Sequence, residues 1–416
     1  MDQINGQKNN NKRKIIMRII KITVSLLVIA ISFTAGNIVS GYGYNINTHI
    51  GLSSSQASNA EVRQFSTLFE VKHELEKNYD GDIDQDKLVE SAVKGMTASL
   101  QDPYTLYMTL DEYNKYMDSN SGEFMGIGVY IESKDNKVVV TSTIPGGPAE
   151  KAGIIAGDVI YSANGETLAG DTQKAVSIIT GPEKATIKLV IIRNDSQEID
   201  LDVDRDKVKS VSVAGDMVND KVGYIALSNF DLNVSKDFTS KLQDLKDKGM
   251  KGLIIDLRNN GGGYLNEAVN IASQFIPKGD TITYTIDKYN KKAVMQSVGG
   301  IEEKMPVVIL TNGNTASASE VVTGALKDYN IAQSVGTTTF GKGIVQLPYE
   351  LPNKDGGLKV TVSKYYTPNG NNIHKIGIAP DYEVKLTEDQ AKMNPYDRNK
   401  DPQFLKALEV IQNKTN

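Results

Sequence analysis

The chain of 416 residues contains no cysteine and only three histidines. The lack of cysteine excludes thiol catalysis, disulfide bonds and cysteine-ligated metal sites. A formal net charge of −5 gives no electrostatic case for binding nucleic acid. Because histidine is scarce, any serine or threonine nucleophile raises the question of which group takes its proton. What the sequence does contain is enough length for two or three domains.

The first 40 residues differ in composition from the rest of the chain. Residues 1–21 contain a basic cluster, and residues 22–39 carry no charge. A run of roughly 18–20 apolar residues spans a bilayer, and its basic flank stays in the cytoplasm. We therefore expect a cytoplasmic stub over 1–21, a transmembrane anchor over 22–39 and a linker rich in Gly, Ser and Asn over 40–60.

The alternative interpretation of this region is a cleaved signal peptide. The stretch FTAG, residues 33–36, offers a possible cleavage site. The uncharged run continues past that site and is long for a signal peptide, so we favour a retained anchor. Under either interpretation the remaining chain lies outside the cytoplasm.

Three changes of periodicity divide the rest of the chain. Residues 61–117 show helical spacing and predict a helical N-terminal domain. Residues 118–207 show short β runs separated by glycine, with one helix near 171–179. From 208 to 395 strands alternate with helices, which indicates an α/β layer fold. An amphipathic helix follows over residues 396–416.

Two serines, Ser317 and Ser319, lie in a turn of small residues after the apolar strand VVIL and at the start of a helix. Backbone N–H groups at a helix start favour developing negative charge, so one serine is a candidate nucleophile. The competing interpretation is that these serines only cap the helix, a position that serine commonly occupies.

The candidates for a proton acceptor are few. His49 lies in the linker and His73 in the N-terminal helix, whereas His374 lies in a polar loop, where we expect a solvated side chain. Lys342 is flanked by glycines and apolar residues in TFGKGIV. Desolvation lowers the pKa of lysine from about 10.4 and makes the neutral amine available as a base. A surface lysine in a glycine turn is the alternative.

Three consecutive glycines, residues 261–263, follow the apolar strand that ends in DLRNN. Glycines at a strand end expose backbone N–H groups without obstruction by Cβ atoms, so this turn is a candidate half of an oxyanion hole. A phosphate-binding loop is the weaker alternative, because the Lys-Ser/Thr ending of a P-loop is missing. A simply flexible turn is the third possibility.

Taken together, the stretches DLRNNGGG, NTASASEVVTGALKD, TTFGKGIVQ and KYYTPNGNNIHKIGIAPD resemble the carboxyl-terminal processing peptidases, also called tail-specific proteases. The preceding stretches GIGVYI and IPGGPAEKAGIIAGDVIYSANG resemble the PDZ domain of those proteases. The resemblance extends from about residue 61 to the C-terminus, in the order that the family has. It implies an α/β protease core of the crotonase-like ClpP/crotonase type over 208–395, with an inserted PDZ domain over 118–207.

The resemblance also implies roles for individual residues. Ser317 matches the nucleophile, Lys342 the general base and Gln346 the residue that helps to position the lysine amine. Ser319, Glu320 and Asp328 are then structural. The oxyanion donors implied are the amide of Ala318 and that of Gly262 or Gly263, between which the sequence does not choose. No metal and no organic cofactor are implied.

The sequence departs from the family pattern at two positions. Many members have proline where this chain has Gly261, a change that loosens the turn and keeps its amides. Many members also have a basic residue before the Gly-Pro at the end of the PDZ helix, where this chain has Thr180. The second departure puts in doubt any signal from a bound peptide to the active site through that side chain.

We expect protein or peptide substrates with free C-termini as partners of the PDZ domain. Gly126, Ile127 and Gly128 directly precede a strand that begins near Val129, and their N–H groups suit a carboxylate. We expect an apolar pocket there, formed by Ile127 and Val129 with Val176 and Ile179 from the helix. A glycine-rich strand entry with no ligand is the alternative.

We also expect a homodimer in which the apolar stripes of 61–117 and of the C-terminal helix pair between subunits; packing of both against their own chain is the alternative. The stripes consist of Phe65, Leu68, Phe69, Leu88, Val89 and Met96 and of Phe404, Leu405, Leu408 and Ile411. The expected activity is that of a membrane-anchored serine endopeptidase. An inactive PDZ scaffold and an acyl-CoA enzyme of crotonase type are the rival functions.

Overall fold

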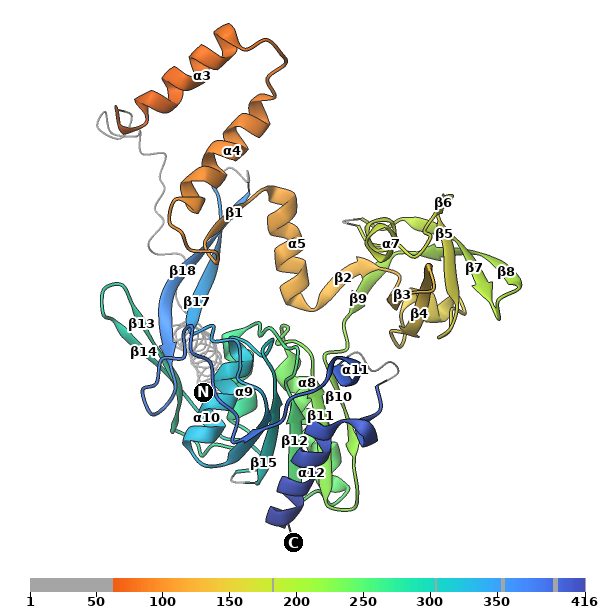
Figure 1. The fold of residues 1–416 in the computed structure, drawn as a ribbon, viewed down its shortest axis with the longest axis vertical. Helices are drawn as coiled ribbons and strands as arrows, with labels where there is room; N and C mark the ends of the chain where they lie inside the picture. The colour runs from red at the N-terminus through yellow and green to blue at the C-terminus, as the bar shows by residue number, and fades with distance from the viewer. Residues whose placement is uncertain (1–62, 182, 304, 353–355, 392–395, 416) are drawn as a thin grey trace, which may run out of the picture. The chain divides into compact units, whose positions relative to one another are not determined.

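The computed structural model of the chain describes residues 63–181, 183–303, 305–352, 356–391 and 396–415 (Figure 1). Within these ranges no helix is long and apolar enough to cross a membrane. The stub predicted over residues 1–21, the anchor over 22–39 and the linker over 40–60 all lie outside them. The chain divides into two compact units, Met1–Asp84 and Gln85–Asn416.

The described part of the first unit contains helix α3 (Ser66–Asn78). This helix carries the predicted apolar residues, and none of its residues is buried. Phe69 is 59% and Leu68 48% exposed. The helical spacing therefore predicts the helix correctly, and the apolar stripe has no cover from the described residues of its own unit.

The second unit begins with a helical segment. Helix α4 (Gln85–Ala98) leads through the short strand β1 (Leu106–Met108) to helix α5 (Leu110–Ser121). Thr109 and Glu112 form a capping box at the start of α5, which satisfies backbone N–H groups that a helix leaves free. Helix α5 ends at Gly122, whose φ of 72° is a left-handed conformation that glycine adopts easily.

The following β domain is an antiparallel sheet with two short helices, α6 (Pro148–Lys151) and α7 (Thr172–Ile179). Asp171 caps α7 by accepting the N–H of Lys174 at 2.9 Å. The sheet has the order β3-β4-β5-β7-β8, so β3 is an edge strand. Its strands are β3 (Val129–Lys134), β4 (Lys137–Thr143), β5 (Val159–Ala163), β7 (Thr186–Arg193) and β8 (Gln197–Asp204), and β6 (Glu166–Thr167) pairs with β5.

Two strands connect this β domain to the rest of the unit. β2 (Glu123–Gly126) and β9 (Asp206–Lys209) pair antiparallel, with Gly126 opposite Asp206. The chain therefore enters and leaves the β domain through one two-stranded ribbon, as expected for a domain inserted into a longer chain.

The C-terminal half is built on a six-stranded sheet of order β10-β11-β12-β15-β16-β19. All neighbouring pairs are parallel except β10 with β11. The strands are β10 (Val213–Met217), β11 (Val222–Leu227), β12 (Gly252–Asp256), β15 (Val307–Thr311), β16 (Ala332–Gly336) and β19 (Tyr382–Glu383). The intervening helices are α8 (Val234–Asp247), α9 (Leu265–Ala272) and α10 (Ala318–Asp328). The alternation of strands and helices thus predicts the α/β class correctly.

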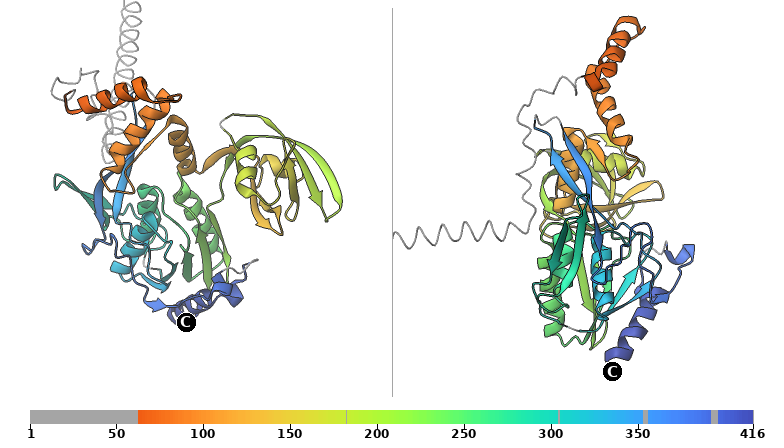
Figure 2. Two further views of the ribbon diagram at one scale, coloured as in Figure 1. Left: turned by 45° about the horizontal axis from the view of Figure 1, so that its top comes forward. Right: turned by 90° about the vertical axis from the view of Figure 1, so that its left-hand side faces the viewer.

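Successive residues of the central strands face opposite layers, because side chains alternate across a sheet. Leu253 and Ile255 lie in one apolar cluster with side chains of α8, α9 and α10. Ile254 lies in a second cluster with Phe404 and Ile411 of α12 (Pro402–Thr415). Figure 2 shows α12, in dark blue, on the side of the sheet away from α8. The core is therefore a three-layer sandwich of helices, sheet and helix.

This packing corrects the expectation that the C-terminal helix pairs with a second subunit. Phe404 and Ile411 are buried against the chain's own sheet, and Leu408 packs against the same cluster. Of the four predicted interface residues only Leu405, 44% exposed, faces outward. An amphipathic pattern indicates that one face is covered but not which surface covers it.

A second sheet, all antiparallel, carries residues of the candidate site. Its order is β1-β18-β13-β14, and β17 pairs with β18. The strands are β13 (Thr281–Asp287), β14 (Lys292–Gln296), β17 (Ile344–Glu350) and β18 (Gly357–Tyr366).

Candidate active site

Ser317 lies between strand β15 and helix α10, with φ 57° and ψ −116°. A non-glycine residue with positive φ is strained by about 1–3 kcal/mol and persists only where its surroundings hold it. The hydroxyl of Tyr365 donates to the Ser317 carbonyl at 3.1 Å, and the N–H of Ala316 donates to the Asn260 carbonyl at 3.0 Å. The turn around Ser317 is therefore fixed by segments that are distant in the sequence.

The two serines have different environments. Ser317 is partly exposed, whereas Ser319 is completely buried. The Ser319 hydroxyl donates to the Asn260 carbonyl at 3.0 Å, so it joins the start of α10 to the loop after β12. A fully buried hydroxyl with a backbone partner cannot reach a peptide, which leaves Ser317 as the accessible serine.

The carboxylate of Glu320 accepts four hydrogen bonds. One oxygen, Oε2, accepts the N–H of Ser317 at 2.8 Å and the N–H of Lys342 at 2.9 Å. The other, Oε1, accepts the hydroxyl of Thr339 at 2.6 Å and the N–H of Gly341 at 2.7 Å. One buried side chain thus ties the start of α10 to the loop before β17. Sequence analysis assigns Glu320 only a structural role and does not indicate this link.

Lys342 lies two residues before the start of β17, and it is partly buried. Burial lowers the pKa of its amine, and the nearby ammonium of Lys359 lowers the pKa further, while the Glu320 carboxylate opposes both effects. The Lys342 Nζ lies 5.3 Å from the centre of the Tyr104 ring. Lys342 is therefore not a surface lysine in a glycine turn, and Tyr104 is a neighbour that sequence analysis missed.

Gln346 is on β17, opposite Thr361 of β18. Its Nε2 atom is buried and has no hydrogen-bond partner among the described residues, and the same is true of the Thr361 hydroxyl. A buried amide donor without an acceptor is costly, by roughly 1–3 kcal/mol.

The glycine triplet lies against Ser317. A Cβ atom on Gly262, which has φ 102°, would be 2.7 Å from the Ser317 Cβ and 2.9 Å from the Ala318 nitrogen. A Cβ atom on Gly263, which has φ 141°, would be 2.4 Å from the Phe230 carbonyl. Only glycine fits at either position.

The amides of the two glycines differ in how they are used. The N–H of Gly262 donates to Asn260 Oδ1 at 2.9 Å. Within the part of the chain that the structure describes, the N–H groups of Gly263 and Ala318 have no hydrogen-bond partner. Of the two glycines, Gly263 has the amide that is free to receive a ligand.

The histidines are placed differently from one another. His49 lies outside the described residues, and His73 is exposed on α3. His374 is partly buried rather than solvated as expected, because its loop packs on residues 341–343: the N–H of Lys375 donates to the Gly341 carbonyl at 2.8 Å. Burial, with Lys375 and Lys364 nearby, lowers the pKa of His374.

The predicted peptide-binding residues lie around the entry to β3. Gly126 ends β2, Gly128 has φ 78° and Val129 begins the edge strand β3. Ile127 is completely buried in the core of the β domain, as is Ile179 at 3% exposure, so neither lines an open pocket as expected. Val129 is half-buried and Val176 is 48% exposed.

A basic side chain reaches the end of helix α7 from elsewhere in the chain. The Nε of Arg205 donates to the Ile179 carbonyl at 3.0 Å, and its Nη2 donates to the Ile178 carbonyl. A Cβ atom on Gly181 would be 2.4 Å from Nη1 of Arg205. The family pattern lacks its basic residue at Thr180, and Arg205, which the motifs do not single out, brings a guanidinium to the same end of the helix.

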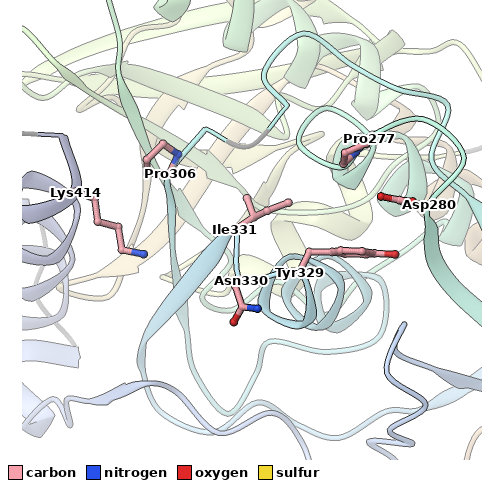
Figure 3. Close-up of a pocket in the computed structure, with 7 residues that line it drawn as sticks. All are labelled: Pro277, Asp280, Pro306, Tyr329, Asn330, Ile331 and Lys414. Carbon is pink, nitrogen blue, oxygen red and sulfur yellow. The ribbon is translucent and has the colours of Figure 1, made fainter.

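A pocket of about 600 Å³ lies elsewhere on the core (Figure 3). Residues 329–331, which line it, follow the C-terminal end of α10, whereas Ser317 is at the N-terminal end of this 11-residue helix. The other lining residues are Pro277, Asp280, Pro306 and Lys414. None of the candidate catalytic residues lines it. The described residues also contain no group of three His, Cys, Asp or Glu side chains arranged to hold a metal ion.

Three family descriptions match successive parts of the chain. "Peptidase family S41" matches residues 221–384, "PDZ domain" matches residues 139–193, and "Activating protease CtpB N-terminal domain" matches residues 44–112. The S41 match contains both Ser317 and Lys342. The β domain of residues 123–209 therefore contains a PDZ domain.

Similar proteins carry names of the same kind. A "Carboxy-terminal processing protease CtpA" of Bacillus subtilis is 36% identical over 351 residues, which is 84% of this chain and 74% of that protein. A "Probable CtpA-like serine protease" of Staphylococcus aureus is 37% identical over 373 residues, or 88% and 73% of the two chains. A solved putative S41 protease from Bacteroides fragilis shares the fold, with a TM-score of 0.55 at 19% identity over 82% of this chain and 94% of that one.

The resemblance found in the sequence is thus confirmed by the family matches and by relatives that cover most of the chain. This chain is a serine-type peptidase with a PDZ domain and belongs to peptidase family S41, with the carboxyl-terminal processing proteases.

Proposed function

We propose that this chain is a membrane-anchored endopeptidase that cleaves extracytoplasmic proteins near their C-termini with Ser317 and Lys342. The observation that carries the proposal is the Glu320 carboxylate, whose Oε2 accepts the backbone N–H groups of both residues. Proton transfer requires the two side chains to lie within hydrogen-bond reach of each other, and a shared buried acceptor supports this by holding their backbone segments side by side.

In the proposed reaction the Ser317 oxygen attacks the scissile carbonyl carbon and its proton passes to the neutral amine of Lys342. The ammonium then gives that proton to the leaving amine as the peptide bond breaks, which leaves an ester on Ser317. Water hydrolyses the ester in the second half of the cycle, with Lys342 again as the base. The lowered pKa of Lys342 supports this role, because a base must be unprotonated to act.

We assign the oxyanion hole to the N–H groups of Ala318 and Gly263. Both are free among the described residues, whereas the Gly262 amide is bonded to Asn260. Free backbone donors beside the nucleophile stabilise the negative oxygen of the tetrahedral intermediate. Gln346, on the strand that follows Lys342, would help to position the Lys342 amine by accepting one of its N–H groups at the amide oxygen, which leaves the lone pair of the amine for the Ser317 proton.

The PDZ domain would select substrates by their free carboxyl terminus. Strand β3 is an edge strand, so a peptide can add to it as a further strand held by main-chain hydrogen bonds. The N–H groups of residues 126–128 would receive the carboxylate, and Val129 and Val176 would contact the last side chain. This recognition mode needs no cofactor.

We further propose that residues 22–39 anchor the protein in the cell membrane and that the exposed apolar residues of α3 and α4 form a homodimer contact. Phe69 at 59%, Val89 at 57% and Met96 at 53% exposure support such a contact, since exposed apolar clusters mark interaction surfaces. The C-terminal helix is not part of this proposal.

The test uses the full-length protein in detergent, with an unfolded protein substrate that ends in apolar residues and with a fluorophosphonate probe. We expect cleavage and covalent labelling at Ser317, both abolished by Ser317→Ala and retained by Ser319→Ala. Binding of the substrate without cleavage or labelling would instead identify an inactive PDZ scaffold. Amidation of the substrate's C-terminus is expected to weaken binding by more than about tenfold, or 1.4 kcal/mol.

A further inference from the structure

A turn from outside the matched peptidase segment lies beside the candidate base. The turn comprises residues 102–105, with the sequence DPYT, and precedes β1. The Nζ of Lys342 is 5.3 Å from the centre of the Tyr104 ring. A separation within about 6 Å is a cation–π distance and also means that the ring excludes water from one side of the amine. The peptidase segment 221–384 therefore does not enclose Lys342 by itself.

The turn is held firmly in this position. Asp102 accepts the N–H of Tyr104 at 3.0 Å and the hydroxyl of Thr105 at 2.6 Å. The Thr105 hydroxyl in turn accepts the N–H of Thr361 at 3.0 Å, and Thr105 is 7% exposed. Strand β1 then continues the attachment by pairing with β18, with Leu106 opposite Lys359. The turn that carries Tyr104 is thus attached to the sheet that also carries Gln346.

We propose that Tyr104 is a positioning residue of the active site, which covers the amine of Lys342 and keeps it neutral and aimed for proton transfer. This inference rests on the proposed role of Lys342 as the base. It adds that a turn N-terminal to the PDZ domain completes the catalytic centre, so the peptidase segment needs the N-terminal part of the chain for full activity.

The ring has two opposite effects on the amine. Exclusion of water favours the neutral form, whereas the negative face of the ring favours the ammonium by about 0.5–2 kcal/mol. Exclusion of water is the larger effect here, because Lys342 is partly buried and its pKa is lowered chiefly by burial.

Other charged groups near the amine come from different elements. Lys359 of β18 lowers the pKa of Lys342, as burial does, whereas Glu320 of α10 raises it. Asp102 of the turn and His374 of the neighbouring loop interact with each other, and Lys364 and Lys375 also lie near His374.

The chain offers a matched control. Tyr116 of α5 lies over Lys359 much as Tyr104 lies over Lys342, with 5.2 Å from Nζ to the ring centre. Removing either ring exposes one lysine amine in the same part of the molecule. The ring of Tyr104 lies over the candidate base and that of Tyr116 does not, so of these two substitutions the removal of Tyr104 is the one expected to change how reactivity depends on pH.

The experiment measures the rate at which a fluorophosphonate labels Ser317 in the full-length protein between pH 6 and about pH 10, together with thermal unfolding. The labelling rate is expected to rise with pH, and we expect Tyr104→Ala to shift the midpoint of this rise upward by about one pH unit. The labelling rate of the variant should therefore be about tenfold lower at pH 7 and should reach the parent rate at high pH. Tyr104→Phe and Tyr116→Ala are expected to keep the parent midpoint.

A second pair of variants covers the case in which Tyr104→Ala does not fold. Thr105→Val removes the hydroxyl that anchors the turn and is expected to raise the midpoint, whereas Thr105→Ser keeps the hydroxyl and the midpoint. An unchanged or lowered midpoint in folded Tyr104→Ala overturns the inference. Labelling of Lys342→Ala at the parent rate would instead overturn the role of Lys342 as the base, so the two failures are distinguishable.

Discussion

Glu320 accepts the backbone N–H of Lys342 at 2.9 Å, although Glu320 lies in the first turn of α10 and Lys342 precedes β17. The same oxygen accepts the N–H of Ser317 at 2.8 Å. One carboxylate oxygen therefore sets the spacing between the backbones that carry the two candidate catalytic residues. Glu320 is completely buried, which limits competition by water for its carboxylate oxygens.

This contact predicts a large effect of Glu320→Gln. A glutamine turns one of the two acceptor oxygens into a donor that faces N–H groups, and an unsatisfied buried group costs about 1–3 kcal/mol. We expect a lower melting temperature and a loss of cleavage of about a hundredfold, since small displacements of catalytic groups have effects of that size. Glu409→Gln, on the exposed face of α12, serves as the control and is expected to change neither.

A second prediction separates the lysine from the nearby histidine. Lys342→Ala and Lys342→Arg are expected to abolish cleavage while the protein stays folded, because a guanidinium remains charged at any working pH. His374→Ala is expected to keep most activity. Steady-state cleavage measures the activity of the three variants, and circular dichroism shows whether they are folded. An active Lys342→Ala with an inactive His374→Ala would refute the assignment of Lys342 as the base.

The glycine triplet provides a prediction with an internal control. Gly262→Ala would place a Cβ 2.7 Å from that of Ser317 at a φ of 102°, so we expect near-complete loss of cleavage and a destabilisation of about 1–3 kcal/mol. A Cβ on the adjacent Gly261 meets no atom within 4 Å. Gly261→Ala is therefore expected to keep activity and stability. Equal effects of the two substitutions on cleavage and on urea unfolding would contradict this geometry.

The two serines are expected to respond in opposite ways. Ser317→Ala should remove cleavage with little change in stability. Ser319→Ala should keep cleavage and lower the free energy of unfolding by about 1 kcal/mol, because its hydroxyl bonds the buried Asn260 carbonyl. Cleavage assays with denaturant titrations of both variants test the pair, and loss of cleavage only in Ser319→Ala would reverse the assignment.

The lowered pKa of Lys342 also predicts a dependence of stability on pH. The unfolded chain holds the lysine proton up to about pH 10.4, whereas the folded protein releases it at lower pH. The charged amine therefore lowers the free energy of unfolding, and this effect is complete at pH values below the pKa of Lys342 in the folded protein. The effect disappears as the pH rises to the pKa of the lysine in the unfolded chain. Lys342→Met is expected to raise the melting temperature at pH 7 and to lose that advantage near pH 10.

Thermal unfolding at several pH values measures this difference. The matched control is Lys236→Met on the exposed side of α8, which removes a solvated amine and is expected to leave the pH dependence unchanged. A Lys342→Met variant that is less stable than the parent at pH 7 would show that the amine is not penalised in the folded state.

Local patterns determine much of this protein. Period-two and helical spacing predict strands and helices such as β7 and α8, because each pattern reflects one buried face. Glycines 261–263 and the small residues around Ser317 mark the turns where backbone must approach closely. The motifs also predict the family. These features depend on a few neighbouring residues, so the sequence alone contains them.

Contacts between distant segments depended on the tertiary structure. The sequence does not distinguish Gly262 from Gly263, since only the position of the Asn260 side chain shows which of the two amides is already bonded. It did not indicate Tyr104, because the pairing of β1 with β18 brings that turn to Lys342. It predicted the apolar face of α12 but not that the chain's own sheet covers it. Periodicity shows that a surface is buried, and only the folded chain decides which residues bury it.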